Sequence, residues 1–254
     1  MKWLRFAHAG QQGFGALEGE TVRVFSGELF GDPAPTEQVL PVADVHVLAP
    51  CQPTTVVGLW NNFHALAQKN GWTPPAEPLY FIKAQGSLAG PGSTTPAAPE
   101  SVGRVAFEGE LAIVIGRPTH AVSVEQAPAH IAGYTCANDI TAIELLNRDA
   151  SFAQWTRAKG LPGFGVFGPV IETDFDYAKA TLRTRVGGRE RQNYALSDMI
   201  VPPAQLLSLI SQDIALQPGD LILCGTSLGV LPMKPGTEVE VEIDGIGVLQ
   251  HRYG

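Results

Sequence analysis

Positive charge is scarce in this 254-residue sequence, which carries 17 Lys and Arg against 25 Asp and Glu, for a formal net charge of -8. No basic stripe is available to neutralise a phosphate backbone, so nucleic acid is not an expected partner. Apolar runs of membrane-spanning length are also missing, and Met1 to Phe6 lack the apolar core of a secretory signal. We therefore expect a cytoplasmic protein without a membrane partner.

Cysteine is equally sparse. Cys51, Cys136 and Cys224 lie far apart in the sequence, and no C-x-x-C pair indicates zinc or dithiol chemistry. Cys136 and Cys224 sit in apolar, strand-like surroundings, so we expect buried thiols without a nucleophilic role.

Helical signals are few, whereas 28 glycines and 20 prolines separate many short apolar runs. This pattern is typical of strands joined by tight turns, and it predicts a mainly β protein with some α (an α+β fold). Strands are expected at residues 2–7, 21–25, 54–59 and 238–243. Residues 1–50 are predicted to form a small β-rich N-terminal domain, and residues 51–254 a catalytic domain, with the boundary near Cys51.

Three segments favour helices. Residues 62–70 begin with an asparagine suited to an N-cap and end at Gly71, residues 142–155 have helical character, and residues 203–211 start with prolines that pre-set the first turn. The Gly163–Gly168 segment satisfies G-x-G-x-x-G. A strand, rather than a helix, is expected to follow it, so we do not interpret it as a dinucleotide site.

Acidic residues form the strongest chemical signal. Glu108 and Glu110 flank one glycine before an apolar run, and residues i and i+2 of a strand share a face. Asp139 ends a second apolar run. Three carboxylates without a His or Cys cluster favour Mg²⁺ or Mn²⁺ over zinc. On spacing alone, a solvated strand edge and a helix cap remain the alternative interpretation.

The segments 107–116 and 133–139 resemble those of the fumarylacetoacetate hydrolase family. The similarity continues in the same order through Lys159-Gly160, Gly168-Pro169, Gly219-Asp220 and Gly225-Thr226, over about residues 54–254. It implies a mixed β-roll or β-sandwich catalytic domain after a small N-terminal appendage. It also implies a divalent cation on Glu108, Glu110 and Asp139, a homodimer, and a small-molecule oxo-acid substrate.

The resemblance suggests roles for five further residues. His64 would be the general base and Lys159 would stabilise negative charge on the substrate, while Thr226, Gly225 and Lys83 would contact the substrate. The alternatives are an ordinary surface histidine, a solvated loop cation for Lys159, and a structural or surface role for Lys83.

Four positions depart from the family pattern. Ala67 stands where relatives carry a glutamate that orients the histidine, Ile143 and Leu146 replace polar groups, and Ser227 replaces a proline. The pocket wall near Ile143 and Leu146 should be apolar or turned inward.

The resemblance implies a metal-stabilised enolate, and hydrolysis of a C–C bond in an acylpyruvate is the reaction we expect first. The departures keep two alternatives open. One is isomerisation or decarboxylation of a 2-hydroxy-dienoate or an oxaloacetate-like acid, as in 2-hydroxyhepta-2,4-diene-1,7-dioate isomerases. The other is a relative that binds metal and oxo acid without turnover.

Overall fold

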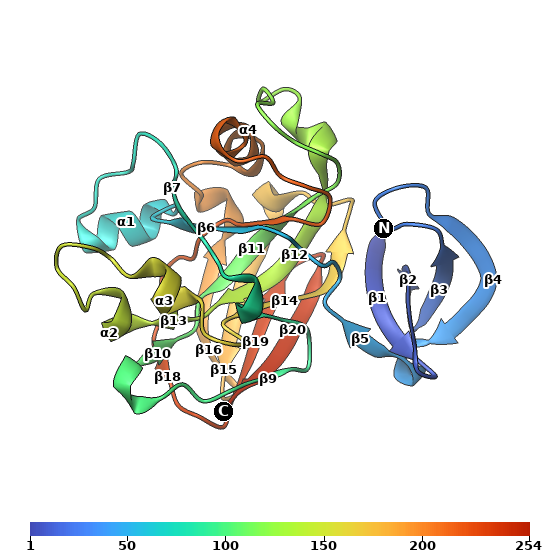
Figure 1. Cartoon of the computed structure of the whole chain (residues 1–254), viewed down its shortest axis with the longest axis horizontal. Helices are drawn as coiled ribbons and strands as arrows, with labels where there is room; N and C mark the ends of the chain where they lie inside the picture. The colour runs from blue at the N-terminus through green and yellow to red at the C-terminus, as the bar shows by residue number, and fades with distance from the viewer.

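The computed structural model describes residues 1–254, and strands dominate it (Figure 1). The first five strands form the lobe on the right of Figure 1. Their bounds are β1 (Lys2–His8), β2 (Gln11–Glu18), β3 (Thr21–Ser26), β4 (Ala34–Pro41) and β5 (His46–Leu48). Strand β1 also pairs with β14 (Gly165–Glu172), so the lobe and the remainder share one sheet. The predicted strands at residues 2–7 and 21–25 are confirmed; the domain boundary near Cys51 stays a prediction.

The largest sheet runs in the order β4-β3-β2-β1-β14-β12-β11-β17-β6-β7, with β5 and β8 attached at its side. Its strands beyond the lobe are β6 (Val56–Trp60), β7 (Leu79–Ile82), β8 (Leu88–Ala89), β11 (Gly109–Ile115), β12 (Ile131–Asp139), β14 and β17 (Leu221–Leu223). Strand β11 is central and every one of its residues is buried. A near-continuous apolar run is what a strand covered on both faces requires.

A second sheet has five strands in the order β16-β15-β19-β20-β9. These are β16 (Arg189–Ala195), β15 (Thr181–Val186), β19 (Thr237–Ile243), β20 (Gly247–Tyr253) and β9 (Thr94–Thr95). Strand β19 alternates buried valine and isoleucine with outward glutamates, as predicted for residues 238–243. A small third sheet joins β13 (Thr141–Ala142), β10 (Val105–Ala106) and β18 (Pro232–Met233).

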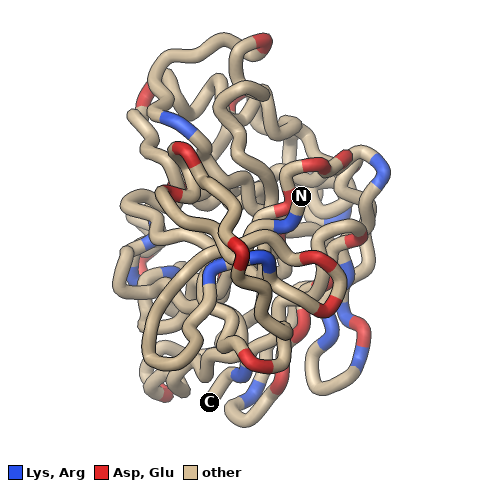
Figure 2. Tube along the Cα trace, turned by 90° about the vertical axis from the view of Figure 1, so that its right-hand side faces the viewer, with Lys and Arg blue, Asp and Glu red and all other residues tan.

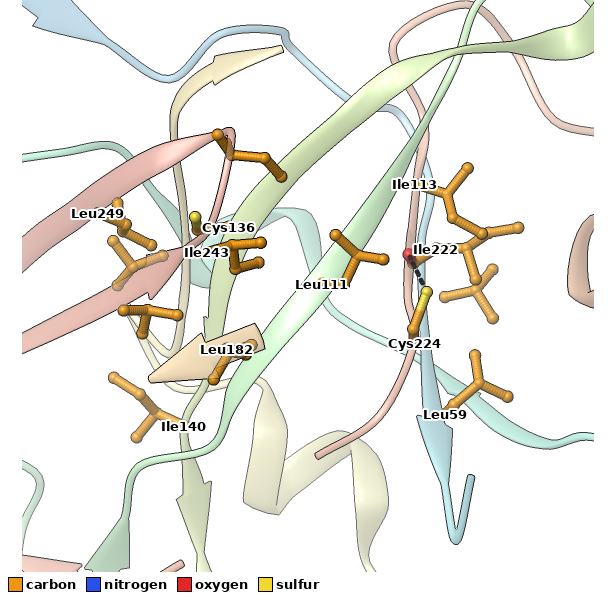
Figure 3. Close-up of a cluster of buried hydrophobic side chains, with 14 of the residues drawn as sticks. Leu59, Leu111, Ile113, Cys136, Ile140, Leu182, Ile222, Cys224, Ile243 and Leu249 are labelled. Atoms are coloured by element: carbon orange, nitrogen blue, oxygen red, sulfur yellow. Dashed lines mark hydrogen bonds between the residues drawn. The ribbon is translucent and has the colours of Figure 1, made fainter. Parts of the chain in front are cut away.

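The main core lies where the two larger sheets contribute apolar side chains to one cluster (Figure 3). Leu111 and Ile113 of β11 meet Leu182 of β15 and Leu249 of β20 there. Cys136 and Cys224 belong to the same cluster, and all three cysteines are buried, as predicted. Burial raises the pKa of the Cys136 thiol to about 12, which keeps it protonated.

Four α-helices lie outside the sheets: α1 (His64–Asn70), α2 (Ile143–Leu146), α3 (Trp155–Lys159) and α4 (Pro203–Asp213). The prediction for residues 203–211 is confirmed. The expected helix at residues 142–155 is instead two short helices. Between them the Asp149 carboxylate accepts hydrogen bonds from the backbone N–H and hydroxyl of Ser151, which competes with continued helix.

Helix α1 ends at Gly71 in the left-handed conformation, as predicted, but its N-cap is Phe63. The asparagine cap was wrong because Asn62 is needed elsewhere. Its amide donates to the carbonyls of Val201 and Cys224 and accepts from the Val201 N–H. At the start of the helix, the Asp198 carboxylate accepts a hydrogen bond from the N–H of Ala65 instead.

Residues 165–172 form β14, so a strand, as expected, occupies the place where a dinucleotide site would need a helix. No helix is long and apolar enough to cross a membrane. Lys and Arg positions are interspersed with Asp and Glu along the trace (Figure 2).

Candidate metal centre

Glu108, Glu110 and Asp139 come together at one end of the antiparallel pair β11–β12. Gly109 pairs with Asn138, so the start of β11 lies beside the end of β12. One carboxylate oxygen of each acid lies within 4.8 Å of those of the other two. The predicted cluster is therefore present, and Glu110 and Asp139 are fully buried rather than on a solvated edge.

The glycine between the glutamates is required by the opposite face of β11. A Cβ atom at Gly109 would collide with the hydroxyl of Thr184 on β15 and would lie 3.1 Å from Oε1 of Gln192. The E-G-E spacing thus lets both glutamates face the cluster while their strand packs closely on the second sheet.

Two buried lysines cross-link the cluster. Nζ of Lys159, the last residue of α3, lies 2.8 Å from Oε2 of Glu108 and 2.7 Å from Oδ2 of Asp139. Nζ of Lys83, just after β7, lies 2.6 Å from Oδ1 of Asp139 and donates to the Lys159 carbonyl at 2.8 Å. Neither lysine is a solvated surface cation, since each is at most 3% exposed.

The pKa directions follow from burial and from these contacts. Burial lowers the pKa of Lys159, but Asp139, Glu108 and Glu110 outweigh it and the pKa lies above its ordinary value. Burial raises the pKa of Asp139, but Lys159 and Lys83 outweigh it and the pKa falls below its usual range. Burial lowers the pKa of Lys83.

Glu110 is the least compensated of the three acids. Its Oε2 accepts the N–H of Gly225 at 2.8 Å, whereas its buried Oε1 has no hydrogen-bond partner. Burial and the neighbouring Asp139 carboxylate raise its pKa well above the usual value. A buried carboxylate oxygen without a donor is costly. The all-oxygen donor set and this orphan atom fit a hard divalent cation held by Glu108, Glu110 and Asp139.

Several residues that support the acids were not identified from the sequence. The Thr141 hydroxyl donates to Oε1 of Glu108 at 2.6 Å, and Asn138 Oδ1 accepts the Glu108 N–H at 2.9 Å. Nδ2 of Asn138 in turn lies 2.8 Å from Nε2 of His251. Asn138 and Thr141 lie within two positions of Asp139, so the sequence could have indicated that they support this acid. Nothing in the sequence links His251 to the acids.

Thr226 and Gly225 follow β17 and lie against Gly109 and Glu110. The Thr226 hydroxyl donates to the Gly109 carbonyl at 2.9 Å and accepts from Gln192 Nε2 at 2.8 Å. Tyr194 donates to the same carbonyl at 2.7 Å. The only hydroxyl proton of Thr226 is thus used to bind the Gly109 carbonyl between the two glutamates. A contact between Thr226 and the substrate stays a prediction.

His64 is the first residue of α1, and its side chain is exposed. Its segment reaches the cluster indirectly: Asn62 donates to the Cys224 carbonyl, and the next residue, Gly225, binds Glu110. Ala67 is buried on the same helix and offers no partner for the imidazole. The structure thus brings together Glu108, Glu110, Asp139, Lys83, Lys159 and Gly225, with Thr226 beside them, and leaves His64 as a neighbour without a side-chain contact to them.

Comparison with known proteins identifies this architecture. The model described as "Fumarylacetoacetate (FAA) hydrolase C-terminal" matches residues 55–253, and a "Rv2993c-like, N-terminal" model matches residues 1–50. The chain belongs to the fumarylacetoacetate hydrolase family. Its mainly β fold with a small N-terminal appendage, expected from the resemblance, is confirmed.

Among family members, Protein Rv2993c of Mycobacterium tuberculosis is 40% identical over 255 residues, covering 96% of this chain and 95% of that protein. The 4-hydroxyphenylacetate degradation bifunctional isomerase/decarboxylase of Salmonella dublin is 36% identical over 198 residues, 77% of this chain and 46% of that protein. A crystal structure named 2-hydroxyhepta-2,4-diene-1,7-dioate isomerase from Mycobacterium marinum superposes with a TM-score of 0.91 at 39% identity, covering 100% of this chain and 98% of that one.

Proposed function

We propose that this protein is a divalent-metal-dependent isomerase that moves a proton within a small 2-oxo or 2-hydroxy-dienoic acid through an enolate. The observation that carries the proposal is the cluster of Glu108, Glu110 and Asp139, with an unpartnered carboxylate oxygen on Glu110. The names of the Salmonella and M. marinum relatives support the alternative considered above, isomerisation or decarboxylation, over acylpyruvate hydrolysis, the reaction we expected first; the Salmonella name gives both reactions and the M. marinum name gives isomerisation.

Charge in the cluster suits such a substrate. When all of these groups are ionised, as metal binding requires, the three carboxylates outnumber the two ammonium groups and the cluster is one positive charge short. A bound Mg²⁺ or Mn²⁺ would supply Lewis-acid stabilisation for the negative charge that develops on a 2-oxo oxygen. Lys159 stays charged next to Glu108 and Asp139, so it adds a fixed positive charge in a water-poor site.

The remaining residues hold the acids in place. Lys83 orients Asp139 from one side and Lys159 from the other, while Gly225 fixes one oxygen of Glu110. His64 remains the predicted proton carrier.

Proton NMR in D₂O with added Mg²⁺ would test the proposal. Oxaloacetate, a 2-hydroxy-2,4-dienoic acid and an acylpyruvate would each be followed with and without protein. We expect enzyme-dependent tautomerisation, with deuterium incorporated at C3 or, for the dienoic acid, at C3 or C5, without cleavage; this activity should be lost in Glu110→Ala and after chelation.

Two other products would each contradict isomerisation. Formation of two acids would establish hydrolysis, and release of CO₂ would establish decarboxylation. Binding of oxalate with Mg²⁺ without any turnover of the panel would instead support a binding protein. We also propose a homodimer, which light scattering on the eluted protein would check.

A further inference from the structure

A cavity with five aromatic residues among its ten lining residues is linked to the carboxylate cluster through Phe81, whose ring lies next to Lys159. It has a volume of about 790 Å³, which is ample for a small organic acid. We call it the aromatic pocket and define it by six of its lining residues. They are Trp60, Trp72, Tyr80, Phe81, Leu146 and Trp155.

Strand β7 with the residue after it, and helix α3, each contribute at least one ring to the pocket and one lysine to the charged cluster. Phe81 on β7 and Lys83, the residue after the strand, are two positions apart and both buried, so they share a face. On α3, Trp155 and Lys159 are four positions apart and also share a face. The rings of Phe81 and Trp155 stack at 4.9 Å with an interplanar angle of 8°, and both lysines bind Asp139.

The two regions are in contact through Lys159. Its Nζ lies 5.2 Å from the centroid of the Phe81 ring and 2.7 Å from Asp139. Lys159 thus contacts the carboxylates with its ammonium group and lies over the stacked ring of Phe81. A 2-oxo acid whose head binds at the cluster beside Lys159 has this ring within reach of its other end.

Charge is missing from the pocket wall. None of its lining residues is Lys, Arg, His, Asp or Glu. The Tyr80 hydroxyl is directed to Asp213 at 2.8 Å, so the Tyr80 side chain presents its ring. Leu146, one of the aliphatic departures noted in the sequence, forms part of the same wall. A distal carboxylate there would lose water without gaining a cation.

We propose that the aromatic pocket binds the distal end of the substrate and selects 2-oxo acids with an aryl or other apolar tail over acids with a second carboxylate. This inference rests on the proposed function, because it takes the head of the substrate to bind at Glu108, Glu110 and Asp139. It separates this chain from relatives whose names specify dioates.

Three unreactive mimics that share one head group test the proposal by calorimetry on the full chain with Mg²⁺. Oxamate has no tail, N-phenyloxamate has an aryl tail and N-oxalylglycine has a carboxylate tail. Burial of the phenyl ring should make N-phenyloxamate bind at least about tenfold more tightly than oxamate. N-oxalylglycine should bind no more tightly than oxamate.

Two variants change the pocket without touching the cluster. Trp72 lies 4.8 Å from Trp60 and is 37% exposed, so Trp72→Ala should fold and should remove most of the preference for the phenyl tail. Leu146→Arg adds a cation to the wall and should reverse the preference toward N-oxalylglycine. Trp3→Leu, in the N-terminal lobe, is the matched control and should keep the wild-type ratio.

The outcomes distinguish this inference from the proposed function. If oxamate binds in a Mg²⁺-dependent manner but the phenyl tail adds nothing, or if the tail preference survives in both pocket variants, the pocket proposal fails alone. If none of the three mimics binds with Mg²⁺, both proposals fail.

Discussion

Nζ of Lys83 lies 2.6 Å from Oδ1 of Asp139, and neither side chain is exposed to solvent. The two residues are 56 positions apart, so this ion pair joins the end of β7 to the end of β12. The second bond of Lys83, to the Lys159 carbonyl, ties α3 to the same point. Lys83 is thus a positioning residue for the acid cluster, whatever contact it makes with substrate.

Lys83→Met should destabilise the protein strongly, because it removes one cation from a buried carboxylate and a donor from a buried carbonyl. Breaking a buried ion pair on one side costs roughly 3 kcal/mol or more. Urea unfolding measures the loss. Lys179→Met is the matched control, since the Lys179–Asp176 pair is exposed to solvent and its loss should barely move the unfolding midpoint. Equal midpoints for Lys83→Met and wild type would contradict the role given to Lys83.

Glu110→Gln keeps the shape of the side chain and removes its charge, so it should abolish stabilisation by Mg²⁺. A cation present at a hundred times its Kd adds about 2.7 kcal/mol to the folded state. We expect Mg²⁺ to raise the Tm of the wild type, and to leave that of Glu110→Gln unchanged. Glu238→Gln, which alters an exposed glutamate of β19, should retain the wild-type shift. An unchanged Mg²⁺ response in Glu110→Gln would exclude this glutamate as a ligand.

How far the site could be predicted depended on whether its geometry was local. Glu108 and Glu110 share a face because of strand periodicity, which two residues of sequence encode. Their meeting with Asp139 needed the pairing of β11 with β12, and only the resemblance to a family supplied it in advance. The asparagine cap of α1 failed for the same reason: Asn62 bonds to Val201, 139 positions away.

The aromatic pocket shows more clearly which features could not be predicted from the sequence. Ile143 and Leu146 were expected to make one wall apolar or to turn it inward; Leu146 does line an apolar pocket, whereas Ile143 is not among its lining residues. Trp60, Trp72 and Trp155 gave no pattern in the sequence, because their rings meet only when a loop and a helix fold over the edge of the sheet. Tertiary contacts of this kind have no periodic signature.

Gly109→Ala should destabilise the fold, because the new methyl group would collide with the Thr184 hydroxyl. Overpacking of a core costs about 1–3 kcal/mol. Adding Thr184→Ala removes the colliding atom and should restore part of the lost stability in chemical denaturation, beyond any change that Thr184→Ala causes alone. The prediction fails if the double variant is no more stable than Gly109→Ala, since the contact between the sheets would then not be the cause.

His251 should make folding stability depend on pH in the acid range. Its ring is buried, which lowers its pKa from 6.5 to about 4. The hydrogen bonds require the neutral form: Asn138 Oδ1 accepts the Glu108 N–H, so Nδ2 faces His251 and the ring nitrogen there must accept. Protonation of His251 would place an N–H of the ring opposite the amide N–H of Asn138. This repulsion would disturb the segment that carries Glu108.

The unfolded chain binds this proton near pH 6.5 and the folded chain only near pH 4. The contribution of His251 is therefore complete above pH 6.5 and is lost as the pH falls from 6.5 toward 4, by about 3 kcal/mol in total. Urea unfolding at several pH values would measure it in the wild type and in His251→Gln, whose amide oxygen still accepts from Asn138 but does not titrate. We expect a flatter profile for His251→Gln and an unaltered one for His46→Gln, which changes an exposed histidine. Parallel profiles for wild type and His251→Gln would mean that other groups cause the acid sensitivity, and that His251 does not link pH to the position of Glu108.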